Sequence, residues 1–166
     1  MIIGNPYEFA IVFDRVKQWN STNKENNGFF ALSVDGTLFP NIVNNTVINS
    51  ALYDVEKSLK NIPVDDEMFS LDKKDALEEI FNLVYPCDFS IDNDYRYELS
   101  PIALTDESCF VFAVKAQDNV RILAATLEYD RENSTYLFDN ITVKEVILSR
   151  DIMKEIISEV QKELCT

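Results

Sequence analysis

Apolar residues repeat at short intervals along the first part of the chain, in the pattern of a β-strand. Residues 8–16 place Phe9, Ile11 and Phe13 on one face, with further apolar residues between them. A strand that is apolar on both faces is typical of the centre of a sheet. This run therefore predicts a central strand.

Turn residues between apolar runs predict hairpins. Asp35-Gly36 separates residues 29–34 from residues 37–39, and such a pair is typical of a two-residue hairpin turn. A polar Ala-Gln-Asp-Asn connection separates two later β-rich runs in the same way. The later strands are expected at residues 95–99, 109–115, 120–129 and 141–148.

Three segments carry apolar residues at helical spacing. The first is expected to start from a cap at Ser50 and to run to about Lys60. The second starts after Asp72 and stops before Pro86, because proline cannot continue a helix. The third follows Ser149 and should be strongly amphipathic. Its apolar stripe consists of Ile152, Met153, Ile156, Ile157, Val160 and Leu164.

The order of these elements favours an α+β fold with a mainly antiparallel sheet and about three helices, including the C-terminal amphipathic helix. Strands come in hairpin-like groups, whereas a doubly wound fold alternates strands and helices strictly. The 166 residues are 46% hydrophobic, and they contain no interdomain linker or internal repeat. We therefore expect one domain over residues 1–166, for which a single core is enough.

Negative charge is concentrated in the middle of the chain. The net charge is −14, and residues 62–108 contribute −10 of it, with thirteen acidic residues against three basic ones. Residues 1–61 contribute −1 and residues 109–166 contribute −3. Such a field repels phosphate backbones and anionic lipids, so we expect no nucleic-acid or membrane binding and a cationic partner instead. The alternative is an acidic surface that only keeps the protein soluble.

The sequence contains no recognisable catalytic machinery. There is no histidine, which excludes histidine-activated nucleophiles, and three scattered glycines cannot build a phosphate-binding loop. Asp92-Asn93-Asp94 with Glu98 partly resembles a calcium loop, but the turn glycine and the glutamate at the twelfth position are missing. We expect no enzyme, no metal and no cofactor. An enzyme would require a deep pocket with converging, perturbed carboxylates.

The chain shows no sign of export or membrane insertion. Its N-terminus lacks the basic cluster and apolar run of a signal peptide, and its longest apolar runs fall far short of the about 20 residues of a membrane helix. Cys87, Cys109 and Cys165 are odd in number and widely spaced, which suits reduced thiols. We therefore expect a cytoplasmic protein.

Short motifs spread over nearly the whole chain form a recognisable set. They are residues 1–11, 19–21, 34–40, 71–74, 92–96, 99–101 and 109–113. Together they resemble the immunity protein 42 family of bacterial polymorphic toxin systems. The resemblance implies a cytosolic protein that binds a cognate toxin and blocks it without catalysis. It implies no particular interface residues.

The interface expectation therefore rests on charge. Acidic residues in or beside predicted loops, where a partner has access, could face a basic toxin domain, a nuclease being one candidate, and mimic phosphate. The neighbouring tyrosines could add contact area or could instead pack inward. An acidic adaptor or regulator unrelated to toxins is the alternative function. The candidate partner-binding residues are Asp88, Asp92, Asp94, Tyr95, Tyr97 and Glu98, then Asp65, Asp66 and Glu67.

Overall fold

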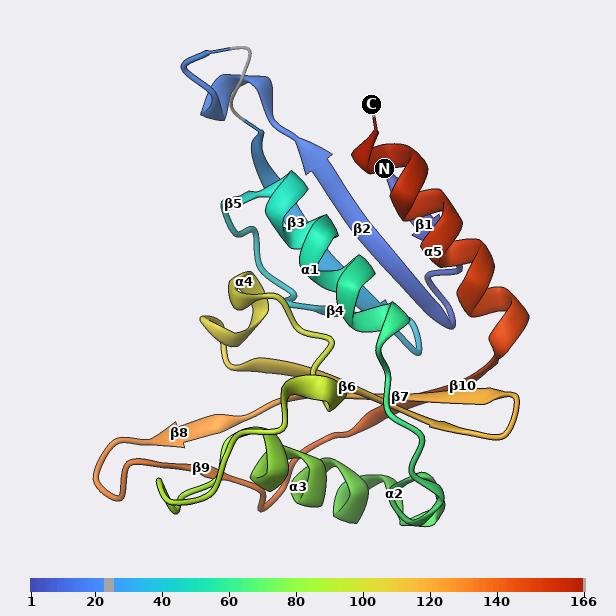
Figure 1. Ribbon diagram of the computed structural model, residues 1–166. Helices are drawn as coiled ribbons and strands as arrows, with labels where there is room; N and C mark the ends of the chain where they lie inside the picture. The colour runs from blue at the N-terminus through green and yellow to red at the C-terminus, as the bar shows by residue number, and fades with distance from the viewer. Residues whose placement is uncertain (23–25, 166) are drawn as a thin grey trace.

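The computed structural model describes residues 1–22 and 26–165 (Figure 1). The helices in these ranges are α1 (Ile48–Lys60), α2 (Asp66–Ser70), α3 (Lys73–Val84), α4 (Ile102–Thr105) and α5 (Arg150–Leu164), with 3₁₀ turns η1 (Lys17–Trp19) and η2 (Tyr95–Tyr97). The strands are β1 (Ile2–Gly4), β2 (Phe9–Arg15), β3 (Asn27–Val34), β4 (Thr37–Phe39), β5 (Thr46–Val47), β6 (Cys109–Ala116), β7 (Asn119–Thr126), β8 (Glu128–Asp130), β9 (Thr135–Leu137) and β10 (Lys144–Ser149).

The N-terminal sheet has the order β1-β2-β3-β4, and β5 also pairs with β3. All these pairings are antiparallel. Helices α1 and α5 lie side by side in front of this sheet (Figure 1). The apolar face of β2, with Phe9 and Phe13, packs beneath Leu52 of α1 and Val160 of α5, and all four are almost fully buried. Residues 8–16 therefore form the central strand that their pattern predicted.

The second sheet has the order β10-β7-β6, and its strands β6 and β7 are buried on both faces. Alternate residues of β6 and β7, such as Val111 and Ile122, join the cluster beneath α1 and α5. The others, such as Phe112 and Leu123, join a second cluster with α3. The chain thus builds two hydrophobic clusters that share this sheet, where we expected a single core.

The predicted fold class, hairpins and long helices are confirmed. Asp35 and Gly36 have φ of 49° and 69°, as the turn between β3 and β4 requires. The side chain of Asp72 accepts a hydrogen bond from the Lys74 amide and so caps α3. Ser149 caps α5 in the same way. The second predicted hairpin is formed by β6 and β7.

Three local predictions are wrong. Helix α1 begins at Ile48 rather than after a cap at Ser50, because the pairing of β5 with β3 brings the Ile48 amide to the carbonyl of Asn26. The strand expected over residues 95–99 does not form: residues 95–97 are η2, since the Asp94 side chain accepts from the Arg96 amide and turns the backbone, and Glu98 makes only an isolated antiparallel bridge to Phe112. Strand β10 begins only at Lys144, because the residues before it pack into the second cluster.

Candidate functional site

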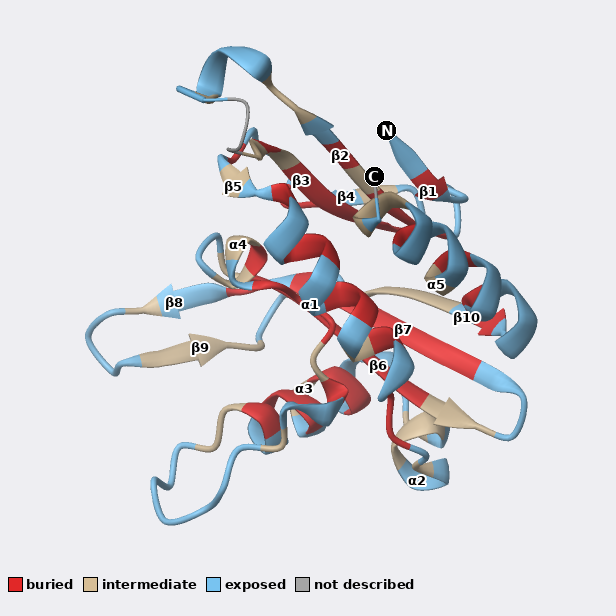
Figure 2. Cartoon of the chain, turned by 45° about the horizontal axis from the view of Figure 1, so that its top comes forward, coloured by how far each residue is buried: buried red, intermediate tan, exposed pale blue. Residues whose placement is uncertain are grey.

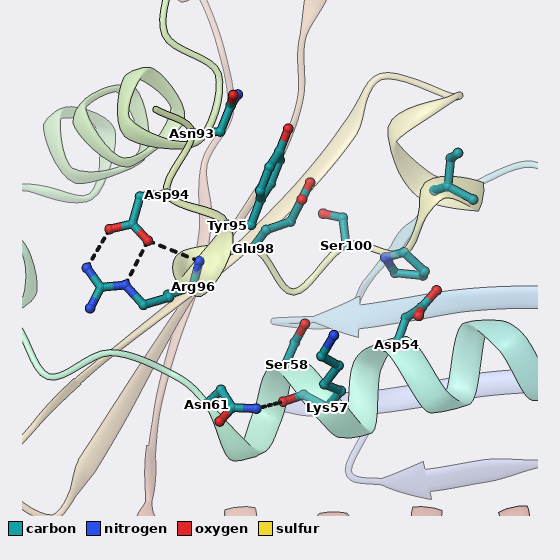
Figure 3. A pocket seen from close by; sticks show the side chains of 12 residues that line it. Asp54, Lys57, Ser58, Asn61, Asn93, Asp94, Tyr95, Arg96, Glu98 and Ser100 are labelled. Atoms are coloured by element: carbon teal, nitrogen blue, oxygen red, sulfur yellow. Dashed lines mark hydrogen bonds and ion pairs between the residues drawn. The ribbon is translucent and has the colours of Figure 1, made fainter. Parts of the chain in front are cut away.

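A hollow of about 600 Å³ opens between α1 and the segment that runs from the end of α3 to α4 (Figure 3). Helix α1 contributes Asp54, Lys57 and Ser58, and Asn61 follows the helix. These positions recur at the spacing of one helical face. The opposite face of α1 carries the buried Leu52, Val55 and Leu59. Packing of that face onto the sheet therefore turns the polar stripe into the hollow.

The other wall of the hollow is built around η2. The guanidinium of Arg96 makes two hydrogen bonds with the Asp94 carboxylate, from Nε at 2.8 Å and from Nη2 at 2.6 Å (Figure 3). The hydrogen bonds from Arg96 lower the pKa of Asp94 below its ordinary value. Asp94 also accepts from the Arg96 backbone amide at 3.2 Å. One carboxylate thus holds both the turn and the only basic side chain of η2.

Glu98 lies deeper in the same wall. It is partly buried and accepts a hydrogen bond from the Tyr85 hydroxyl at the end of α3. Burial raises the pKa of Glu98, and the hydrogen bond from Tyr85 opposes this rise. The ring of Tyr85 also contacts the ring of Tyr95, edge to face, with centroids 6.3 Å apart. These contacts tie η2 to the end of α3.

Tyr97 connects η2 to α2. Its side chain is buried, and its hydroxyl donates to the Asp65 carboxylate at 2.8 Å. Asp65 in turn accepts from the amides of Glu67 and Met68 and caps α2. The hydrogen bond from the Met68 amide is the main cause of the lowered pKa of Asp65, and Tyr97 contributes to it. Burial, with the bond to Asp65, raises the pKa of Tyr97 to about 12.

The loop of residues 87–94 projects beyond α3 and is exposed along most of its length (Figure 2). Hydrogen bonds fix its return, because the Asp94 amide donates to the Leu83 carbonyl at 2.8 Å and the Asn93 side chain donates to the Val84 carbonyl at 2.7 Å. Within the loop, the Asp88 carboxylate accepts from the Ser90 amide. The carboxylates at 88 and 92 therefore stand on a backbone anchored to α3.

The structure brings the nine candidate residues together only in part. Asp94, Tyr95 and Glu98 line the hollow. Asp88, Asp92 and Tyr95 are exposed on or beside the loop, and Asp66 and Glu67 are exposed in the first turn of α2. Asp65 and Tyr97 bond to each other beneath this surface. The inward packing considered for the tyrosines thus applies to Tyr97 and not to Tyr95.

Sequence reasoning missed the contribution of α1. Asp54, Lys57, Ser58 and Asn61 lie outside the acidic segment, and the charge count gave no reason to choose them. Their common helical face was readable from their spacing. What the spacing could not reveal is that the segment before α4 lies opposite this face.

The chemistry of the hollow is that of a mixed polar surface. Burial raises the pKa of Asp54, while the charge of neighbouring Lys57 opposes the rise. Glu98 is engaged by Tyr85, and Asp94 by Arg96. Within residues 1–22 and 26–165, no three histidine, cysteine, aspartate or glutamate side chains gather as metal ligands. No helix in those ranges is both long and apolar enough to cross a membrane.

Comparisons with known proteins place this architecture in a family. The model of the family described as immunity protein 42 matches residues 1–163. A search of curated proteins finds no match. Among solved structures, the chain is similar to CdiI from Burkholderia dolosa AUO158, with a TM-score of 0.78 and 26% sequence identity over 98% of this chain and 99% of that chain. The chain therefore belongs to the immunity protein 42 family.

Proposed function

We propose that this immunity protein neutralises a cognate toxin domain in the cytoplasm by covering a basic surface of the toxin with its acidic residues. The observation that carries the proposal is the anchored loop of residues 87–94, which holds exposed carboxylates beside the hollow. Membership of an immunity protein family supports a toxin protein as the partner. The inhibition requires no catalytic step, no cofactor and no metal.

The candidate residues divide into two roles in this proposal. Asp88, Asp92, Tyr95, Asp66 and Glu67 are exposed and contact the toxin directly. The others hold the surface in place through hydrogen bonds that fix the backbone of η2 and α2. These supporting residues are Asp65, Asp94, Tyr97 and Glu98.

The negative charge of the acidic segment should make association with the toxin fast. Residues 62–108 carry a net charge of −10, and a field of this kind accelerates encounter with a cationic partner. A basic toxin surface of the sort that engages nucleic acid phosphates would be attracted in the same way, and carboxylates would take the place of phosphates. A nuclease domain is therefore the toxin class that the proposal favours.

The test measures association with the cognate toxin domain, inactivated by mutation, as the salt concentration is varied. The association rate should fall steeply between low and physiological salt, because the Debye length shortens from about 30 Å at 0.01 M to about 8 Å at 0.15 M. Asp92→Lys should slow association more than it speeds dissociation. Glu159→Lys, on the exposed face of α5, makes the same change in net charge and is the control.

Two results would contradict the proposal in different ways. An association rate that does not depend on salt would show that charge does not guide the encounter. Equal slowing by Asp92→Lys and Glu159→Lys would show that total charge matters and that the acidic segment is not the contact surface. Absence of binding by the unaltered protein would reject a toxin partner altogether.

A further inference from the structure

A second hollow, of about 610 Å³, lies between the end of α3, the start of the loop of residues 87–94 and the β8–β9 hairpin. We call it the aromatic groove. Six of its twelve lining residues are aromatic. None of these six is among the nine candidate residues. Its aromatic lining residues are Phe81, Tyr85, Phe89, Phe110, Tyr129 and Tyr136.

Four of these rings pack against one another and form a fixed wall. Phe81 contacts Phe110 edge to face at 5.1 Å and Tyr136 at 5.4 Å between centroids, and Tyr85 contacts Phe110 at 5.6 Å. Tyr136 also contacts Tyr129 at 5.0 Å. Such packing restricts the rings before any partner arrives, so binding against them costs little side-chain entropy.

Two further aromatic residues are exposed at the groove. Phe89 has a relative exposure of 102%, so its side chain has no cover from the rest of the chain, and Tyr129 is 45% exposed. A phenylalanine left fully in water contributes no burial to folding. Large aromatic side chains are enriched in the centres of protein interfaces, where they become buried. Phe89 therefore fits a contact that forms only in a complex.

Acidic residues adjoin three of the lining residues of the groove in the sequence. Asp88 lies between the lining residues Cys87 and Phe89, Asp106 follows Thr105, and Asp130 follows Tyr129. The Asp130 carboxylate also accepts from the side chain of Asn133, which lines the groove, at 2.6 Å. Arg131 is the basic residue of the hairpin that bounds the groove. Aromatic faces with carboxylates around them complement a cationic side chain with an apolar stem.

We propose that the aromatic groove receives an arginine-bearing segment of the cognate toxin domain and that Phe89 packs over that segment. Arginine fits both features of the groove, because its guanidinium stacks on aromatic faces and forms hydrogen bonds with carboxylates. The inference rests on the proposed function, since it takes the toxin as the partner. It adds the chemistry of the contact that holds the complex together.

The groove and the first hollow form parts of one surface. The ring of Tyr85 lines the groove, and its hydroxyl donates to Glu98, which lines the first hollow. The loop of residues 87–94 connects the two sites along the chain. The exposed carboxylates at 88 and 92 accelerate the encounter, and the groove then determines how long the toxin stays bound.

The association and dissociation rates of the inactivated toxin domain can therefore be tested separately. Phe89→Ala should increase the dissociation rate about tenfold or more, as expected for a central aromatic anchor, and should leave the association rate within about twofold. Tyr7→Ala removes another highly exposed aromatic residue, far away in the sequence in the turn before β2, and should change neither rate.

A chemical block tests the groove without altering its rings. Cys87 lines the groove and is exposed, Cys165 is exposed at the end of α5, and Cys109 is buried. In a Cys165→Ser variant, a bulky maleimide would react with Cys87 and should abolish tight binding. The matched control is a Cys87→Ser variant modified at Cys165, which should bind as the unmodified protein does.

The outcomes separate the two proposals. The unaltered protein could bind tightly while both Phe89→Ala and the Cys87 adduct dissociate at the same rate as it does. This result would show that the toxin does not bind in the aromatic groove, and it would not contradict the acidic interface. No binding by the unaltered protein would overturn both. Concentration-dependent dimerisation that Phe89→Ala abolishes would show that a second copy of this chain occupies the groove, which would also overturn the inference.

Discussion

Arg121, on the central strand of the second sheet, donates through Nη1 to the carbonyl oxygen of Leu71 at 2.8 Å. The same nitrogen donates to the carbonyls of Phe69 at 2.9 Å and Met68 at 3.2 Å, and Nε donates to Glu145 at 3.2 Å. The side chain is 3% exposed. One buried guanidinium thus satisfies the carbonyls at the end of α2 and fixes the connection to α3 on the sheet.

Replacement of Arg121 should be strongly destabilising. Arg121→Ala leaves several carbonyls without their donor and Glu145 without its counter-charge, so we expect a loss of about 3–5 kcal/mol in the free energy of unfolding. Urea denaturation followed by circular dichroism measures this loss. Arg131→Ala, at an exposed position, is the control and should stay within about 0.5 kcal/mol. Equal stability of the two variants would contradict the role given to Arg121.

The Tyr97 hydroxyl should set part of the acid sensitivity of α2. A carboxyl group with a lowered pKa stabilises the fold above its ordinary pKa, and this contribution is lost as the pH falls through the lowered value. Tyr97→Phe removes one cause of the lowered pKa of Asp65. We expect a higher Asp65 pKa by NMR titration and a loss of about 1 kcal/mol in unfolding free energy at pH 7. An unchanged Asp65 pKa would mean that the amides of α2 alone determine it.

Much of the fold was predictable from the sequence, because long elements carry strong periodic signals. The stripe of α5 and the Asp35-Gly36 turn are local features. The turn forms where it was predicted, and five of the six predicted stripe residues are buried or half-buried, whereas Ile152 is exposed. Elements of two to five residues, such as β5, α2 and α4, carry too few positions to show a period. They depend on partners far away in the sequence, as when Arg121 fixes the end of α2.

The acidic part of the candidate surface was predictable from the sequence, but η2 and the aromatic groove were not. Counting charges identified the acidic segment, and the loop of residues 87–94 is where exposed carboxylates were expected. The error at residues 95–99 came from their alternating pattern, which the Asp94 side chain overrides by capping η2. The aromatic groove joins residues from α3 and the β8–β9 hairpin, and no local pattern indicates that these two segments meet.

Glu98 should make stability depend on pH in the opposite sense to Asp65. Its pKa is raised in the folded state, so the folded state binds the proton more readily, and stability declines as the pH rises through the raised value. Glu98→Gln keeps an acceptor for the Tyr85 hydroxyl and removes the charge. The stability of this variant relative to the unaltered protein should therefore increase from pH 4 to pH 7. Glu159→Gln, at an exposed position, should show no such trend.

Truncation of Phe81 should lower the stability of the fold, whereas truncation of Phe89 should leave it unchanged. Phe81 is 6% exposed and contacts the rings of Tyr85, Phe110, Phe112, Tyr136 and Phe138. Phe81→Ala should cost about 3–5 kcal/mol of unfolding free energy, because it removes a buried ring and leaves a cavity in the second cluster.

Phe89→Ala should leave the unfolding free energy within about 0.5 kcal/mol, since the fully exposed ring has no packing to lose. Thermal and urea unfolding of the two variants under identical conditions provide the comparison. A large loss of stability in Phe89→Ala would mean that the ring packs within the fold, and its exposure would then no longer support a partner contact. If stability is unchanged while dissociation from the toxin is faster, the ring acts in binding and not in folding.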